Sequence, residues 1–233
     1  MSKPVCVIAG VGSGNGTAFA KRFASQGYAV ALLARSEDTI KALEGQLNGA
    51  KAYSCDLTQE ADINTVFGRI RKDLGPVTTL IYNAGGGHFK NIDITTVDDF
   101  TSDWQINALG CLLAAKQVIP GMREAGHGNI VVIGATASLT GNAGFTPFAS
   151  AKAAQRSLAQ SMARHLGPQG IHVSYVIIDG VIDLTRTRKA MPDKLDEFFL
   201  NPDDIAESVF YLTTQQRSAW TFELDLRPFG EKW

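Results

Sequence analysis

The sequence predicts an α/β fold: a doubly wound parallel sheet of about seven strands, with helices on both faces. Two observations lead to this prediction. Short apolar runs rich in Val, Ile, Leu and Ala alternate with longer segments of helical periodicity along the 233 residues. The apolar runs are nearly continuous, as expected of strands buried on both faces of a parallel sheet. Right-handed crossovers then place helices on both faces and a ligand site beyond the strand carboxyl ends.

The first elements show the pattern. Residues 5–10, "VCVIAG", are rich in β-branched residues and run into glycine, which predicts a strand. Residues 16–27, "GTAFAKRFASQG", have helical spacing and stop at Gly27, a residue that commonly ends helices. Residues 28–35, "YAVALLAR", are apolar again and predict the second strand.

The rest of the chain repeats this alternation, and no stretch has the composition of a linker, so we expect one domain over residues 1–233. The further predicted strands are 50–57, 77–85, 129–136, 171–179 and 219–226. The further predicted helices are 39–48, 60–75, 98–125, 148–166 and 202–214.

The composition is that of an ordinary globular protein, with 45% hydrophobic and 19% charged residues. The net charge of −1 gives no reason to expect a nucleic acid or an anionic membrane as partner. No apolar run is long enough to span a bilayer, and the apolar stretch before the first glycines is too short for a signal peptide, so we expect a cytoplasmic protein. Cys6, Cys55 and Cys111 are odd in number and widely spaced, which favours reduced, buried thiols. We expect no metal site.

A glycine-rich loop joins the first strand to the first helix. Residues 10–16 read "GVGSGNG". Glycines permit a tight turn there and let backbone N–H groups approach a pyrophosphate at the positive end of the helix. A plain glycine-rich turn is the alternative. Its position between strand and helix favours a dinucleotide site.

The second predicted strand ends at Arg35 and Ser36. An acid at this point binds the ribose 2′-hydroxyl of NAD, whereas an arginine accommodates the 2′-phosphate of NADP with charge-assisted hydrogen bonds. We therefore expect NADP(H) to be favoured over NAD(H). An ordinary surface arginine at a strand end is the alternative.

Five motifs occur in an order that resembles the short-chain dehydrogenase/reductase family over nearly the whole chain, which implies the Rossmann fold. The motifs are Gly10-x3-Gly14-x-Gly16, Asp56-Leu57, Asn83-Ala84-Gly85, Asn107 in "WQINALG" and Lys152 in "FASAK".

The resemblance implies a role in cofactor binding for several residues. By position these are Gly10, Ser13, Gly14, Asn15 and Gly16 at the pyrophosphate, Asp56 and Leu57 at the adenine, Asn83, Ala84 and Gly85 at the adenosine ribose, Lys152 at the nicotinamide ribose and Ile182 at the carboxamide. Asp56 could instead cap a turn. Asn107, which the resemblance makes a catalytic candidate, could instead bond to backbone inside its own helix.

The chain departs from the family where the reaction takes place. The family uses a tyrosine four residues before the lysine, and a serine thirteen residues before that tyrosine. Phe148 and Ala135 stand at these positions. Some enoyl reductases of the family use Y-x6-K instead, which would place the tyrosine at Phe145, again without a hydroxyl. The resemblance therefore implies that the usual proton-relay pair is missing.

Further departures bear on the substrate. Asp179-Gly180 follows the sixth strand where the family has Pro-Gly, and Leu184 replaces a common threonine. The resemblance places a mobile lid over the substrate at residues 183–201. It also implies a homodimer or homotetramer paired through the helices at 98–125 and 148–166.

Three interpretations of the missing hydroxyls stay open. In the first, which we favour, the protein is an NADP-dependent oxidoreductase that acts by hydride transfer on a carbonyl- or imine-like small molecule. Its proton then comes from Ser138, Asp179, His88 or a water held by Asn107 and Lys152, and an iminium substrate would need none. In the second, the protein only binds NADP(H), as a sensor or structural subunit. In the third, it is an isomerase or dehydratase.

Overall fold

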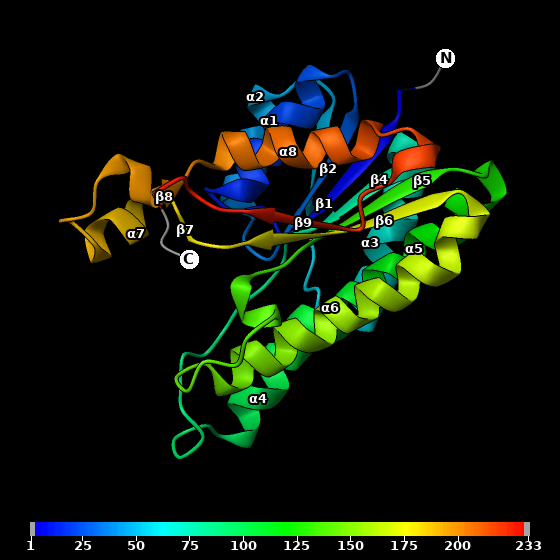
Figure 1. The fold of residues 1–233 in the computed structure, drawn as a ribbon. Helices are drawn as coiled ribbons and strands as arrows, with labels where there is room; N and C mark the ends of the chain where they lie inside the picture. The colour runs from blue at the N-terminus through cyan, green and yellow to red at the C-terminus, as the bar shows by residue number, and fades with distance from the viewer. Residues whose placement is uncertain (1–2, 231–233) are drawn as a thin grey trace.

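The computed structural model describes residues 3–230 and contains a seven-stranded sheet in the order β3-β2-β1-β4-β5-β6-β9. Every neighbouring pair in this sheet is parallel. The prediction of a doubly wound parallel sheet is thus confirmed (Figure 1). The strands are β1 (Val5–Ala9), β2 (Ala29–Ala34), β3 (Ala50–Ser54), β4 (Val77–Tyr82), β5 (Gly128–Ile133), β6 (Ile171–Ile178) and β9 (Glu223–Leu226).

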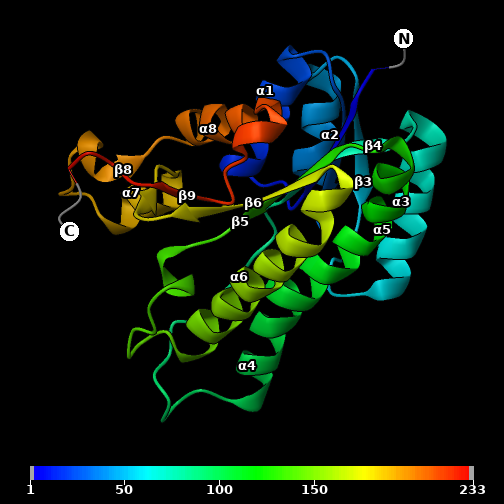
Figure 2. The same ribbon diagram turned by 45° about the vertical axis from the view of Figure 1, so that its right-hand side comes forward.

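Helices cover both faces of the sheet because its strands carry apolar side chains on both sides. One face packs against α1 (Asn15–Ser25), α2 (Glu37–Gln46) and α8 (Pro202–Thr214). The other packs against α3 (Glu60–Leu74), α5 (Gly110–Ala125) and α6 (Thr146–Leu166). Figure 2, turned by 45° from the view of Figure 1, shows α4 (Val97–Trp104) beside α6, and both helices extend beyond the ends of the strands.

The strand order reverses between β1 and β4, so the loops that follow these two strands leave the sheet side by side. The backbone N–H groups of Asn83 and Ala84 both donate to the Ala9 carbonyl, at 2.9 and 2.7 Å. Gly10 has φ +102°, and a Cβ there would lie 2.5 Å from the Cα of Ala84. Only glycine therefore permits this close approach of the two loops.

The structure differs from the predicted elements at two places. The segment predicted as one helix over 98–125 is interrupted by a π-helical turn, Gln105–Leu109, between α4 and α5. Residues 181–200, largely predicted as a lid, contain a short parallel pair, β7 (Val181–Ile182) with β8 (Phe199–Leu200), and the helix α7 (Thr185–Ala190). Two-residue strands are too short to leave a periodic signal in the sequence.

Candidate functional site

The glycine-rich loop lies at the carboxyl ends of β1 and β4, the edge where an open parallel sheet has its ligand-binding crevice. The Asn83 side chain fixes this loop by donating to the Gly10 carbonyl at 2.6 Å. A Cβ on Gly16 would lie 2.7 Å from the Cα of Val11, so the loop folds back closely onto itself. The helix α1 begins at Asn15 and points its positive N-terminal end at the loop.

Two features of the glycine-rich loop and the start of α1 could contact a ligand. Gly12 and Ser13 are exposed on the loop. The Asn15 side chain is buried, and its Oδ1 has no hydrogen-bond partner among residues 3–230. A buried acceptor without a partner costs free energy, which a bound donor would recover.

The residues that follow β2 and β3 lie at the same edge of the sheet. Arg35 and Ser36 are exposed at the end of β2, as the sequence predicts for residues that meet a phosphate. Asp56 is half-buried, and its Oδ1 accepts from the backbone N–H and the hydroxyl of Thr58, at 2.9 and 2.7 Å. Asp56 thus does close a turn, and its role at the adenine remains a prediction. Leu57 is buried beside it.

Lys152 reaches the centre of the crevice from α6. Its Nζ donates to the Ile133 carbonyl at 3.0 Å and to Gln155 Oε1 at 3.1 Å. Burial disfavours the charged form and lowers the pKa of Lys152 to about 8. The ammonium also lies close to Gly85, because a Cβ there would be 3.4 Å from Nζ.

Gln155 is a site residue that the sequence reasoning missed. It is fully buried, accepts from Lys152 and donates from Nε2 to the Asn107 carbonyl at 2.9 Å. A side-chain amide therefore bridges the lysine and the π-helical turn. The available signal was a glutamine three residues after Lys152, on the same face of the helix.

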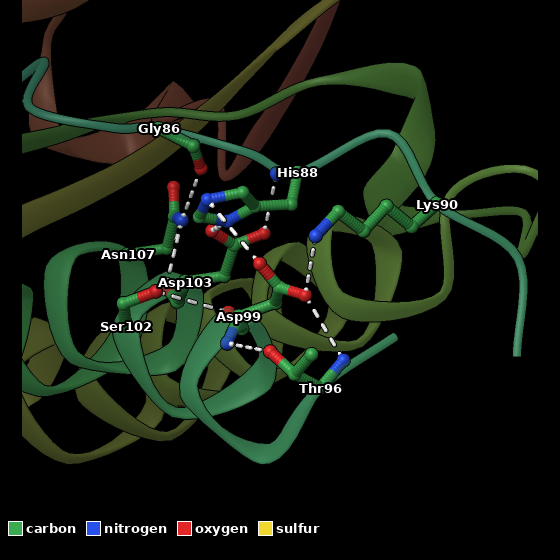
Figure 3. A network of polar contacts seen from close by, with 8 residues as sticks. All are labelled: Gly86, His88, Lys90, Thr96, Asp99, Ser102, Asp103 and Asn107. Carbon is green, nitrogen blue, oxygen red and sulfur yellow. Dashed lines mark hydrogen bonds and ion pairs between the residues drawn. The ribbon is translucent and has the colours of Figure 1, made fainter. Parts of the chain in front are cut away.

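Asn107 lies within the π-helical turn, a feature found frequently at functional sites. Its Nδ2 donates to the carbonyls of Gly86 and Asp103, both at 2.8 Å (Figure 3). The Asp103 bond matches the structural alternative considered for this residue. The Oδ1 atom, however, is buried without a partner among the described residues, and it would lie 3.0 Å from a Cβ on Gly85. It faces the same point as the lysine ammonium.

A polar network fixes the loop after β4 onto α4 (Figure 3). The Asp103 carboxylate accepts from the backbone N–H of His88 at 2.9 Å and contacts its Nδ1 at 2.8 Å. The His88 Nε2 lies 3.5 Å from Asp99 Oδ1, and Lys90 donates to Asp99 Oδ2 at 2.7 Å. The bond from Lys90, with those from Thr96, holds the pKa of Asp99 well below its ordinary value.

Three aromatic rings pack together around Phe148, the position that the family resemblance assigns to the tyrosine, and we call this region the reacting end. Phe148 lies over Gly87, where a Cβ would be 2.7 Å from the ring Cγ. The Phe89 ring packs against Phe145 and Phe148, with centroids 5.0 and 5.4 Å apart, and the latter two are 6.3 Å apart. We call Phe89, Phe145 and Phe148 the ring cluster. It stands where the family places a tyrosine hydroxyl.

The two other predicted catalytic residues have protein partners. Ser138 is buried, and its hydroxyl donates to the Ala135 carbonyl at 2.7 Å. Asp179 accepts from the Thr136 hydroxyl at 2.5 Å and pairs with Arg227 at 2.9 Å. Their catalytic roles remain predictions.

The lid segment lies over the glycine-rich loop. Leu184 Cδ2 would be 2.5 Å from a Cβ on Gly14, and Ile182 pairs with Leu200 in the short sheet. Arg188 holds the segment by ion pairs to Asp183 and Asp196, at 2.7 and 2.6 Å. The role of Ile182 at the carboxamide remains a prediction.

Within residues 3–230 there is no group of three or more His, Cys, Asp or Glu side chains that could hold a metal ion. Among the same residues, no helix is long and apolar enough to cross a membrane. The three cysteines are free and buried.

Comparison with known proteins gives consistent matches. The family model for short chain dehydrogenases matches residues 4–196. A carbonyl reductase family member 4 from Xenopus laevis is 30% identical over 91% of both chains. A 3-oxoacyl-[acyl-carrier-protein] reductase from Mus musculus is 32% identical over 79% of both.

Solved structures agree with this. A short-chain dehydrogenase from Rhodopseudomonas palustris has a TM-score of 0.84 and 30% identity, over 97% of this chain and 99% of that one. A metagenomic short-chain oxidoreductase in complex with NADP has a TM-score of 0.85 and 25% identity, over 99% of both chains.

Proposed function

The chain belongs to the short-chain dehydrogenase family, and from that premise we propose an NADP(H)-dependent oxidoreductase that acts by hydride transfer on a carbonyl- or imine-like small molecule. One observation carries the proposal. The glycine-rich loop, Lys152 and the unpartnered Asn107 Oδ1 all face one crevice, with the polar groups that a dinucleotide needs. The usual tyrosine and serine hydroxyls of the reaction are missing from that crevice.

The residues present fit the cofactor. The glycine-rich loop approaches the next loop more closely than a Cβ would allow, and the buried Asn107 Oδ1 has no hydrogen-bond donor among residues 3–230. The loop would hold the pyrophosphate, Asp56 and Leu57 the adenine, Lys152 the nicotinamide ribose and Ile182 the carboxamide. A reduced nicotinamide, when bound, supplies a hydride.

Arg35 supports the preference for NADP(H). It is exposed at the end of β2, where a 2′-phosphate would lie, and the nearest acids, Glu37 and Asp38, come only in the first turn of α2. Two structural relatives at 25% identity are described as complexes with NADP and with 5-hydroxy-NADP.

The chain's own residues then position the reactants. Gln155 accepts a hydrogen bond from the Lys152 ammonium and orients it. Asn107 donates to the Gly86 carbonyl and fixes that part of the loop. The ring cluster leaves the reacting end without a hydroxyl at position 148. A missing general acid typically costs about 10²–10⁴ in rate and a missing oxyanion donor about 10²–10³, although the two losses need not multiply. Ordinary carbonyl reduction is therefore expected to be slow.

A second candidate function is that of an NADP(H)-binding sensor or structural subunit. The observation that favours it is the same ring cluster, because it leaves the cofactor-binding groups in place and removes the reacting hydroxyls. Cofactor binding without turnover of any carbonyl or imine would select this function.

Assembly into a homodimer or homotetramer is also proposed. The α4–α5 face exposes large apolar side chains, and the family is often oligomeric. These side chains are Val97, Phe100, Trp104 and Leu112. A cytoplasmic location and a small-molecule substrate belong to the same proposal.

The cofactor assignment is tested by fluorescence titration with NADPH and NADH. Wild-type protein should bind NADPH more tightly, because a charge-assisted hydrogen bond contributes about 1.5–3 kcal/mol. Arg35→Asp should remove or reverse this preference. Arg164→Asp, an exposed arginine on α6, serves as the control. Equal affinities for both cofactors, unchanged by Arg35→Asp, would contradict the NADP(H) assignment.

A further inference from the structure

We propose that the lid segment, residues 181–200, is a rigid unit held in shape by Arg188, and that it moves as one body to admit and release the cofactor. This inference rests on the proposed function, which assigns the cofactor to the glycine-rich loop beneath the segment. The family resemblance implies only that the segment is mobile. The opposite case is a segment that is disordered in the free protein and folds when the cofactor binds.

Arg188 connects three separate points of the lid segment. Its Nε and Nη2 donate to the two different carboxylate oxygens of Asp183, both at 2.7 Å. Its Nη1 donates to Asp196 Oδ1 at 2.6 Å, and its Cζ lies 4.1 Å from the centre of the Phe199 ring. A bidentate, charge-assisted contact within such a network is stronger than an isolated surface ion pair. One side chain on α7 thereby joins the beginning of the segment to its end.

The other polar contacts of the lid segment are internal as well. The Thr187 hydroxyl accepts from the Leu184 N–H at 2.9 Å and donates to the Ile182 carbonyl at 2.6 Å. The strands β7 and β8 pair with each other. Among residues 3–230, no hydrogen bond or ion pair joins residues 183–198 to a residue outside the lid segment. The segment therefore keeps its shape through its own contacts.

Both ends of the lid segment are fixed, and there is space beside it. Gly180 precedes it with φ +150°, a conformation that favours glycine, and a Cβ there would lie 2.8 Å from Pro228 Cδ. Asn201 follows it and caps α8, since its Oδ1 accepts from the Asp203 N–H at 2.9 Å. A cavity of about 680 Å³, lined in part by Arg188, lies between the segment, α8 and the end of β9. A rigid body with two short connections and space beside it can tilt without unfolding.

Leu184 is the point where the lid segment meets the glycine-rich loop, beyond the carboxyl ends of the strands (Figure 1). Its Cδ2 would be 2.5 Å from a Cβ on Gly14, so the side chain lies directly on that glycine. A dinucleotide bound to this loop must displace Leu184 or be covered by it. In either case the cofactor exchanges only when the segment moves. Arg188 then acts through the segment, as a positioning residue, without touching the cofactor.

Amide hydrogen exchange of the free protein tests the rigid unit without any cofactor. The amides of residues 188–191 should be protected in the wild type. Arg188→Gln should speed their exchange by about tenfold, because it removes the contacts that connect the segment. Asp183→Asn should act in the same direction with a smaller effect. Arg186→Gln is the matched control, since Arg186 is exposed on the same helix and has no ion pair among the described residues.

Stopped-flow fluorescence with NADPH tests the exchange of the cofactor. Arg188→Gln should raise the dissociation rate by about tenfold, because the segment no longer holds its place over the bound molecule. Arg188→Lys keeps the charge but not the bidentate contact, and it should restore only part of the wild-type rate. Leu184→Ala should also raise the dissociation rate while the amides of α7 stay protected. This variant separates the contact on Gly14 from the contacts of Arg188.

Each measurement has a result that contradicts the inference. Unprotected amides at residues 188–191 in the free wild type, or protection unaffected by both Arg188→Gln and Asp183→Asn, overturns the rigid unit. Dissociation rates of NADPH that are equal in the wild type, Arg188→Gln and Leu184→Ala overturn its role in cofactor exchange. Failure of NADPH to bind contradicts the proposed function and that role, while the exchange measurement still decides whether the segment is rigid.

Discussion

The two ends of the crevice differ sharply in chemistry. The cofactor end is polar and closely fitted: Gly10 lies against Ala84, Asn83 bonds the loop, and Lys152 and Asn107 face a common point. The reacting end is apolar, formed by the ring cluster and Ala135. Phe148 and Lys152 are four positions apart on α6, so the change from one chemistry to the other takes about one helical turn.

The contacts of Lys152 do not depend on the residue at position 148. Lys152 is held by Ile133 and Gln155 without any contribution from the position where the family has its tyrosine. The chain has therefore kept the lysine's environment while replacing the residue whose pKa a neighbouring lysine would lower.

Restoring both hydroxyls should have the largest effect. Phe148→Tyr combined with Ala135→Ser supplies a proton donor and an oxyanion donor to a ketone. We expect NADPH-dependent reduction of 2-tetralone to rise by about 10²–10⁴ over wild type, followed by nicotinamide absorbance. Phe229→Tyr is the control. A double variant that binds NADPH without any gain would show that the two ends differ by more than these hydroxyls.

The next largest effect is expected from a substitution at Gly10, where the two loops pack closely. Gly10→Ala forces a Cβ into Ala84 and a positive φ onto alanine, a strain of about 1–3 kcal/mol. We expect a lower melting temperature and a loss of NADPH affinity of about tenfold or more. Gly12→Ala is the matched control, because a Cβ there meets no atom within 4 Å. Equal losses in both variants would mean that the loop does not need its close approach.

The lowered pKa of Lys152 predicts two opposite trends with pH. The ammonium form donates hydrogen bonds, so NADPH affinity should fall as pH rises through about 8, where the folded protein loses this charge. The unfolded chain keeps the proton to near 10.5 and binds more protons between these values, so the stability of the free protein should rise over that window.

Lys152→Met should flatten both trends, and isothermal titration and thermal unfolding at stepwise pH measure them. Affinity that does not change between pH 7 and pH 9 would place Lys152 away from the cofactor.

Substitutions at Gln155 should have a smaller effect on stability and on the pH dependence of NADPH binding. Gln155→Leu leaves the Asn107 carbonyl without its side-chain donor, at a cost of about 1–3 kcal/mol in unfolding free energy. The pH at which NADPH affinity falls should move down, because the lysine loses an acceptor, and Gln155→Glu should move it up. Gln160→Leu on the same helix is the control. A midpoint unmoved by both changes would limit Gln155 to a structural role.

The sequence predicted the fold because each buried strand is a continuous apolar run and each helix has amphipathic spacing. It also predicted that the loops after β1 and β4 lie together, where Asn83 donates to the Gly10 carbonyl, since parallel strands bring their carboxyl ends to one edge. The π-helical turn at Asn107 was not predictable, because a π turn leaves the helical spacing of apolar residues almost intact.

The missed parts of the site are long-range contacts between side chains. Gln155 reaches Asn107 across 48 residues of sequence, and Thr136 reaches Asp179 across 43. No local pattern carries such pairs. His88 was named as a possible proton source, and its contact with Asp103 on α4 is likewise one that no local pattern predicts.

The most direct test of the account is the rate of NADPH consumption by wild-type protein at saturating cofactor with the ketone 2-tetralone. The account predicts saturable NADPH binding and slow reaction of the ketone. Rapid reduction of the ketone would contradict it, because the described crevice holds no hydroxyl at Ala135 or Phe148 to supply that reaction.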